Sequence, residues 1–203
     1  RLYAPLGLGQ PVSAIDAATG ETVATFAQTA AAEEILLVDT TLLVLRGDPV
    51  AEQALADPAE RKRYGFPVKK TLVAVNTENG ATLWSWSPEG DPLPLTLASD
   101  GNHAYLRTSA GVVCLDATSG TEVWHHTASQ TAIRRALSYA RHALVVADGV
   151  VVCDLGGALT ALSAADGTSL WACDAGTSFH EPVDVFVIDG LVWHKVSHRA
   201  DPM

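Results

Sequence analysis

The chain has 203 residues, of which 48% are hydrophobic and 18% are charged, a composition that supplies ample material for a core and makes extensive disorder unexpected. Its formal net charge of -10 argues against a sequence-independent nucleic-acid surface, because such surfaces need clustered Lys and Arg to neutralise phosphates. No apolar run approaches the roughly 20 residues that a membrane-spanning helix requires, so we expect no transmembrane segment.

A short pattern recurs four times along the chain. It consists of Asp, Asn or Ser, then Gly four residues later, and in three copies Trp four residues beyond the Gly. Because an Asp or Asn side chain accepts hydrogen bonds from nearby backbone N–H groups and Gly adopts positive φ, each copy predicts a hairpin with a bulge. The copies occupy residues 16–24, 76–84, 116–124 and 163–171.

Further strands precede each copy, so we expect sheets of four strands. The glycines are 60, 40 and 47 residues apart, against roughly 40 to 45 for one blade of a propeller. The long first interval contains an insertion at 47–70, which reads as a short helix and a charged loop. The first sheet begins at its second strand near Leu2, and the last stops after two strands. The predicted strands in chain order are 34–38, 42–46, 71–76 and 81–86, then 94–98, 103–107, 112–116 and 121–126, then 143–147, 150–154, 158–163 and 168–173, then 183–188 and 191–196.

The aligned columns predict how the sheets pack. Positions eight and five residues before each Gly hold large aliphatic residues, whereas the position six before it is always small, with Cys114 in place of Ala. A strand packed on both faces has this composition. We therefore expect Trp84, Trp124 and Trp171 to pack between neighbouring sheets, with Phe26 filling the equivalent space in the first copy, where Ala24 replaces Trp.

The segments Leu72 to Trp84, Val112 to Trp124 and Leu159 to Trp171 resemble the repeat of the quinoprotein-like (PQQ-like repeat) β-propellers. That repeat runs through an A-L-D-x-x-T-G-like hairpin into a strand ending in L-W. The resemblance implies an all-β propeller of four-stranded antiparallel blades over residues 1–203, interrupted by the insertion at 47–70. About four blades are visible, and we expect a fragment of a seven- or eight-bladed ring. A closed four-bladed ring is the alternative.

The parts of the chain that do not repeat are the candidate functional sites. The insertion at 47–70, the connection at 127–141 and the loop at His180 should leave the same face of a propeller, where partners commonly bind. We predict no catalytic, cofactor or metal ligand, and His125 and His126 point to opposite faces of one strand and so cannot share a metal ion. The candidate ligand or partner residues on that face are His180, Glu181, Arg134, Arg135 and Tyr64.

Three functions remain open at this stage. The first is a non-catalytic binding or scaffold module of a larger, extracytoplasmic bacterial protein, which presents its loop-rich face to a protein or small ligand. The second is part of an oxidoreductase that uses PQQ with calcium. The resemblance implies an adjacent Cys pair for such enzymes, and the isolated Cys114, Cys153 and Cys173 provide none. The third is a polysaccharide-binding or polysaccharide-cleaving propeller, which would need an aromatic patch such as Tyr64, Phe66 and Tyr139. The oligomeric state is not predicted.

Overall fold

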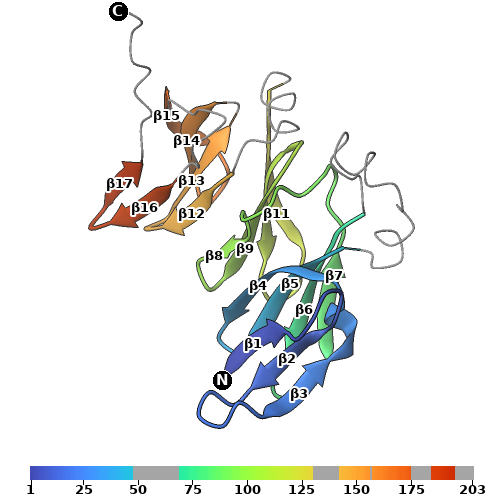
Figure 1. Cartoon of the computed structure of the whole chain (residues 1–203). Helices are drawn as coiled ribbons and strands as arrows, with labels where there is room; N and C mark the ends of the chain where they lie inside the picture. Colours follow the sequence, from blue (N-terminus) through green and yellow to red (C-terminus); the bar gives the residue numbers. More distant parts are fainter. Residues whose placement is uncertain (48–68, 130–141, 156, 175–183, 195–203) are drawn as a thin grey trace, which may run out of the picture. The chain divides into compact units, whose positions relative to one another are not determined.

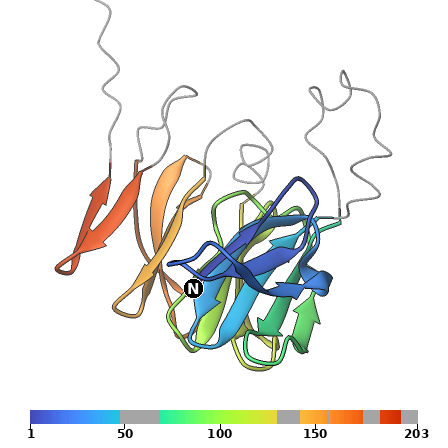
Figure 2. The same cartoon turned by 60° about the horizontal axis from the view of Figure 1, so that its bottom comes forward.

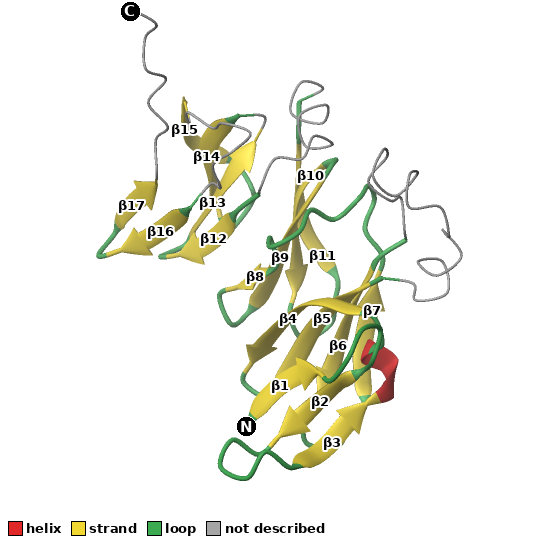
Figure 3. Cartoon of the chain, in the orientation of Figure 1, coloured by secondary structure: helices red, strands yellow, loops and turns green. Residues whose placement is uncertain are grey.

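The computed structural model describes residues 1–47, 69–129, 142–155, 157–174 and 184–194. The chain divides into two compact units. Unit 1 comprises Arg1–Asp91 with Thr118–Gly120, and unit 2 comprises Pro92–Ala117 with Thr121–Met203. In the residues that the structure describes, regular structure is almost entirely β, apart from one 3-10 turn, η1 (Ala27–Thr29), drawn in red in Figure 3. In the described part of the chain, no helix has the length and apolarity to cross a bilayer.

Within each sheet, strands that are neighbours in sequence pair antiparallel, and Figures 1 and 2 show the strands of each sheet side by side in chain order. We call each sheet a blade. Unit 1 holds blade 1, formed by β1 (Leu2–Pro5), β2 (Val12–Ile15) and β3 (Thr22–Phe26), and blade 2, formed by β4 (Ala32–Val38), β5 (Thr41–Arg46), β6 (Thr71–Asn76) and β7 (Thr82–Trp86).

Unit 2 contains the remaining three blades. Blade 3 is formed by β8 (Ala98–Ser99), β9 (His103–Thr108), β10 (Gly111–Asp116) and β11 (Glu122–Thr127). Blade 4 is formed by β12 (Leu144–Ala147), β13 (Val150–Leu155), β14 (Ala158–Ser163) and β15 (Ser169–Asp174). Blade 5 is formed by β16 (Val185–Ile188) and β17 (Leu191–His194). The prediction of four-stranded antiparallel sheets is therefore confirmed for blades 2, 3 and 4. The innermost strand of blade 3 is shorter than predicted, because Pro92 and Pro94 remove backbone donors from the segment before β8.

The repeated turn has the predicted structure. Asp16 Oδ1 accepts hydrogen bonds from the backbone N–H of Ala18 and Thr19, both at 2.9 Å, and these bonds lower the pKa of the Asp16 carboxyl. The four turn glycines have φ between 71° and 76°, a region that side chains other than Gly rarely adopt. In blades 1 to 4 the register of the outer two strands shifts by one residue beside this turn, which confirms the bulge.

The turn glycine is also where the tryptophan of the preceding blade packs. A Cβ on Gly120 would lie 2.6 Å from the ring of Trp84, and one on Gly167 would lie 2.5 Å from the ring of Trp124. Both tryptophans are 8% exposed, and Trp124 Nε1 donates a hydrogen bond to the Ala164 carbonyl at 2.8 Å. A side chain on either glycine would therefore push the indole ring out of its position.

The aromatic residues at this position in blades 1 and 4 differ from Trp84 and Trp124. Phe26 is 2% exposed and lies 4.0 Å from the Cβ position of Gly80, so it occupies the predicted place of the missing Trp in blade 1. Trp171 is 40% exposed, and all six residues of β15 are exposed. The prediction that Trp171 is packed like Trp84 and Trp124 is wrong, because no described turn follows it to cover its ring.

Replacement of Trp124 by Ala should lower the free energy of unfolding by about 3–5 kcal/mol, the usual cost of deleting a large buried aromatic side chain. Urea denaturation followed by circular dichroism measures this change. Val123→Ala is the matched control, because Val123 precedes Trp124 in β11 and is 48% exposed. A loss of less than about 1 kcal/mol for Trp124→Ala would contradict the packing described above.

Candidate functional site

The five candidate residues from the sequence lie outside the described part of the chain. His180, Glu181, Arg134, Arg135 and Tyr64 belong to segments whose placement the structure does not give. The structure does describe the residues at which two of these segments begin and end. The hydrogen bonds and ion pairs of these flanking residues show how the blades hold the ends of the two segments.

Strand direction determines where these connections leave. Because neighbouring strands are antiparallel, the connection from the second to the third strand of a blade leaves at the same end as the connection from the fourth strand to the next blade. Segment 48–68 joins β5 to β6, and segment 130–141 joins β11 to β12. We call this end of each blade its loop-bearing end.

In unit 1, both ends of segment 48–68 are tied to the residues around the start of β4. Gly47 donates a backbone hydrogen bond to the Ala31 carbonyl at 3.0 Å. On the other side of the segment, Lys70 Nζ forms an ion pair with Glu33. The insertion therefore departs from and returns to adjoining points of the framework.

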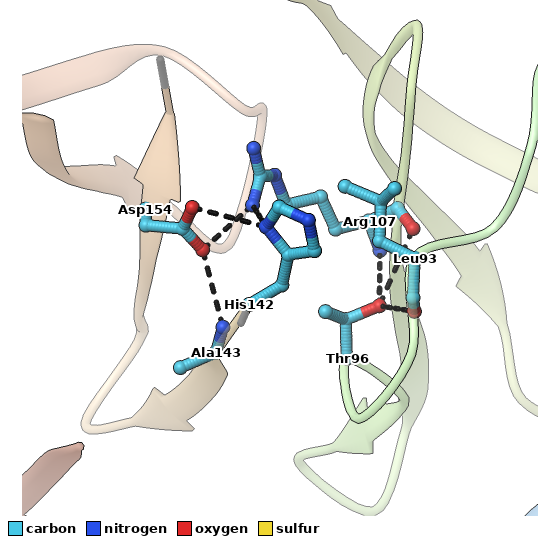
Figure 4. A network of polar contacts seen from close by, with 6 residues as sticks. All are labelled: Leu93, Thr96, Arg107, His142, Ala143 and Asp154. Atoms are coloured by element: carbon cyan, nitrogen blue, oxygen red, sulfur yellow. Dashed lines mark hydrogen bonds and ion pairs between the residues drawn. The ribbon is translucent and has the colours of Figure 1, made fainter. Parts of the chain in front are cut away.

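In unit 2, a buried polar network holds the return of segment 130–141 (Figure 4). The guanidinium Nη1 of Arg107, on β9, lies 2.6 Å from Asp154 Oδ1, on β13, and 2.6 Å from His142 Nδ1. Asp154 Oδ1 also accepts the backbone N–H of Ala143 at 3.1 Å. Arg107, His142 and Asp154 are 1%, 6% and 5% exposed.

The chemistry of these groups assigns the tautomer of His142. Arginine only donates hydrogen bonds, so Nδ1 of His142 accepts from Arg107 and the ring proton is on Nε2. The 3.2 Å approach between this Nδ1 and Asp154 Oδ2 is then a contact of two acceptors, held together by the shared guanidinium. Among the described residues, Arg107 Nε has no hydrogen-bond partner, which adds to the cost of burying this network.

Shortly before the innermost strand of blade 2 and of blade 3, the hydroxyl of a buried threonine forms hydrogen bonds with the backbone of neighbouring segments. Thr96 Oγ1 donates to the Leu93 carbonyl at 2.7 Å and accepts from the Arg107 backbone N–H at 3.3 Å. Thr29 Oγ1 likewise donates to the Phe26 carbonyl at 2.7 Å and accepts from Val12 N–H at 2.8 Å. In blades 2 and 3, a threonine two or three residues before the innermost strand is thus fixed by internal polar bonds.

Sequence reasoning missed Arg107, His142 and Asp154, although a signal for two of them was present. Strand register places Leu45, Arg107 and Asp154 at the same position of blades 2, 3 and 4, each opposite the aliphatic residue eight before the turn Gly. Opposite charges in one otherwise apolar column of consecutive repeats indicate a buried ion pair. Finding it requires alignment of the second strands, whereas the repeated motif aligns only the third and fourth.

Two of the three cysteines are buried in the core, whereas Cys173 is exposed. Burial raises the pKa of the Cys114 and Cys153 thiols to about 12, which keeps both uncharged at neutral pH. His125 and His126 pair with Val113 and Val112 and so lie on opposite faces of the sheet, as predicted. His126 Nδ1 lies 3.0 Å from the Gly167 carbonyl. Within the described ranges, no group of three His, Cys, Asp or Glu side chains is placed to hold a metal ion.

The single variants Asp154→Leu and Arg107→Leu should each lower the free energy of unfolding by about 3–5 kcal/mol, because each leaves a buried charged group without its partner. The double variant Arg107→Leu/Asp154→Leu places in both blades the residue that blade 2 carries in this column. It should recover most of the loss in urea unfolding. Additive losses in the double variant would contradict the assignment of a coupled pair.

Comparison with known proteins places this framework among solved structures at low sequence identity. BamB from Moraxella catarrhalis superposes with a TM-score of 0.63 at 17% identity, over 95% of this chain and 57% of that one. The computationally designed Ika8 protein gives a TM-score of 0.62 at 13% identity, over 92% of this chain and 49% of that one. The quinohemoprotein alcohol dehydrogenase ADHIIG from Pseudomonas putida HK5 gives 0.57 at 12% identity, over 95% of this chain and 36% of that one.

The chain thus spans less than two thirds of the length of each of these structures. No sequence among the curated proteins matches it significantly. The family model described as outer membrane protein assembly factor BamB matches residues 68–192, which is more than half of the chain. Together with the four-stranded antiparallel blades, this match shows that the chain belongs to the BamB-like family of PQQ-like repeat β-propellers.

Proposed function

We propose that this chain is part of a non-catalytic, extracytoplasmic propeller that binds a protein partner through its loop-bearing ends. The observation that carries the proposal is the anchoring of the connections. Gly47 and Lys70 hold the two ends of segment 48–68, and His142 holds the return of segment 130–141. A framework that fixes the ends of long, non-repeating connections can present variable side chains from a constant position.

The environment of the reactive groups also favours binding over catalysis. Arg107, His142 and Asp154 bond to one another and are almost completely buried, so the three groups have no surface on which a substrate could react. Cys114 and Cys153 belong to the packed interior of unit 2. These residues therefore stabilise the framework, and the candidate binding residues remain those of the connections.

The description of the family supports both the kind of partner and the compartment. An outer membrane protein assembly factor acts with other proteins outside the cytoplasm, and the likeness to BamB extends over 95% of this chain. A PQQ-dependent oxidoreductase is the second candidate, favoured by the likeness to the alcohol dehydrogenase of Pseudomonas putida. The sequence contains no adjacent cysteine pair of the kind that the resemblance implies for such enzymes.

Site-specific photocrosslinking tests the binding proposal. A photoreactive phenylalanine analogue placed at Tyr64, Arg134 or His180 should give discrete protein adducts in cells of the source organism. The matched control is the same analogue at Leu83, which is 46% exposed on an outer strand of blade 2. Identical adducts at Leu83, or none at the three loop positions, would count against a partner at the loop-bearing ends.

Titration with PQQ and calcium separates the two candidate functions. We expect no saturable change in tryptophan fluorescence at micromolar PQQ, with or without calcium, because the proposed function is the binding of a protein partner and involves no PQQ. Saturable, calcium-dependent binding together with dye reduction in the presence of alcohols would favour the oxidoreductase. The two experiments are independent, because the crosslinking detects a protein partner and the titration detects PQQ binding.

A further inference from the structure

Asn79 differs from the other asparagines of the chain in the residue that follows it. The asparagines are Asn76, Asn79 and Asn102, and among them Asn79 alone precedes a glycine. The side-chain carbonyl of an asparagine can be attacked by the backbone nitrogen of the next residue, and a glycine, which lacks a Cβ, hinders this attack least. Asn79 is also exposed, so water and hydroxide reach it. Asn79 is therefore the asparagine at which deamidation is chemically easiest.

The native turn restrains this reaction through hydrogen bonds to both reacting groups. The Gly80 N–H, whose nitrogen is the attacking atom, donates to the Asn76 carbonyl at 2.9 Å. Asn79 Oδ1, on the carbonyl that is attacked, accepts the Ala81 N–H at 2.9 Å. Ring closure needs a deprotonated Gly80 nitrogen and a side chain that is free to turn towards it. The reaction therefore proceeds from a locally opened turn.

Contacts with blade 1 help to keep this turn closed. Gln28 Nε2 donates a partly buried hydrogen bond to the Gly80 carbonyl at 2.8 Å. The ring of Phe26 lies 4.0 Å from the Cβ position of Gly80. All of these residues belong to unit 1. The frequency with which the turn opens thus depends on the contact between blade 1 and blade 2.

Blade 4 shows which product such a turn can accommodate. Asp166 holds the place of Asn79 there, directly before the turn glycine. Its Oδ1 accepts the Thr168 N–H at 3.1 Å, just as Asn79 Oδ1 accepts the Ala81 N–H, and it also accepts the Thr168 hydroxyl at 2.8 Å. The bond from this hydroxyl is the main cause that lowers the pKa of the Asp166 carboxyl. An aspartate is therefore compatible with this position of the turn.

We propose that Asn79 is a site of spontaneous deamidation, gated by the opening of its turn. Hydroxide removes the amide proton of Gly80, the nitrogen forms a bond to Asn79 Cγ, and the Cγ–Nδ2 bond breaks. The Nδ2 group takes a proton from water and leaves as ammonia. Water then opens the resulting succinimide, either at Cγ, which gives an aspartate in the normal chain, or at the backbone carbonyl carbon, which gives an isoaspartate. The net change is the exchange of ammonia for water.

The two products differ in what they do to the turn. The aspartate leaves the main chain unchanged and adds a negative charge. The isoaspartate routes the main chain through Cγ and so lengthens it by one methylene between Asn76 and Gly80, whose hydrogen bond closes the turn. Gly80 is then displaced from Phe26 and Gln28. The isoaspartyl form therefore weakens the contact between blade 1 and blade 2, whereas the aspartyl form preserves it.

Ageing of the 203-residue chain at mildly alkaline pH, followed by peptide mass spectrometry with fragmentation, tests the proposal. We expect conversion at Asn79, and none at Asn76 or Asn102 by the time half of Asn79 has reacted. The same chain aged in urea should convert faster, because its turn is open. An unconverted Asn79 in the folded chain would overturn the proposal, and so would equal rates in the folded and unfolded chains.

The variant Gln28→Ala tests whether blade 1 controls the opening. It removes the hydrogen bond to the Gly80 carbonyl and should accelerate conversion of Asn79 by about 2- to 10-fold, the effect of one lost hydrogen bond on a local opening equilibrium. Gln10→Ala is the matched control, because Gln10 is exposed and belongs to the same unit. Circular dichroism verifies that both variants fold. An unchanged rate in Gln28→Ala would contradict the gating.

The products are compared through a variant that has the same composition and charge. Asn79→Asp differs from the isoaspartyl form only in the linkage of the main chain. We expect Asn79→Asp to melt at the temperature of the unaged chain. The isoaspartyl fraction, separated by chromatography and identified by labelling with an isoaspartyl methyltransferase, should melt at a lower temperature. Equal melting temperatures for the two isomers would contradict the predicted displacement of Gly80. These measurements involve no partner, so their outcome is independent of the binding proposal.

Discussion

The architecture depends on the contact between an indole ring and a glycine turn. The glycine has to adopt positive φ to close its bulged hairpin, and it has to lack a side chain to admit the tryptophan of the preceding blade. One residue therefore satisfies a local and a tertiary requirement at the same time. This coincidence explains why the motif recurs with so little variation while the rest of each repeat diverges.

Much of the fold could be predicted from sequence because these requirements are local. Asp16 and Gly20 specify their turn through bonds within five residues, and the alternation around Trp84 and Trp124 specifies the strand that follows. The exposure of Trp171 could not be predicted in this way. It depends on whether another turn covers the ring, and the residues of β15 carry no information about that.

The candidate site was less predictable for a related reason. The non-repeating segments were recognisable because they interrupt the period, but the residues that hold them lie within the repeats. Arg107 and Asp154 are 47 residues apart in sequence and belong to different blades, so neither is notable until strand register brings them together. The buried threonines before the innermost strands are similarly ordinary in sequence, and only their hydrogen bonds identify them.

The Arg107–Asp154 pair also distinguishes between blades that are otherwise interchangeable. Consecutive repeats of similar sequence are liable to pair in the wrong order during folding, since their apolar faces are alike. At the position of the second strand that faces the residue eight before the turn Gly, blade 2 has Leu45, whereas blades 3 and 4 have Arg107 and Asp154. Any other neighbour would leave an arginine or an aspartate buried against aliphatic side chains. The pair therefore favours blade 3 and blade 4 as direct neighbours. It also limits how freely these repeats could be duplicated or exchanged in evolution.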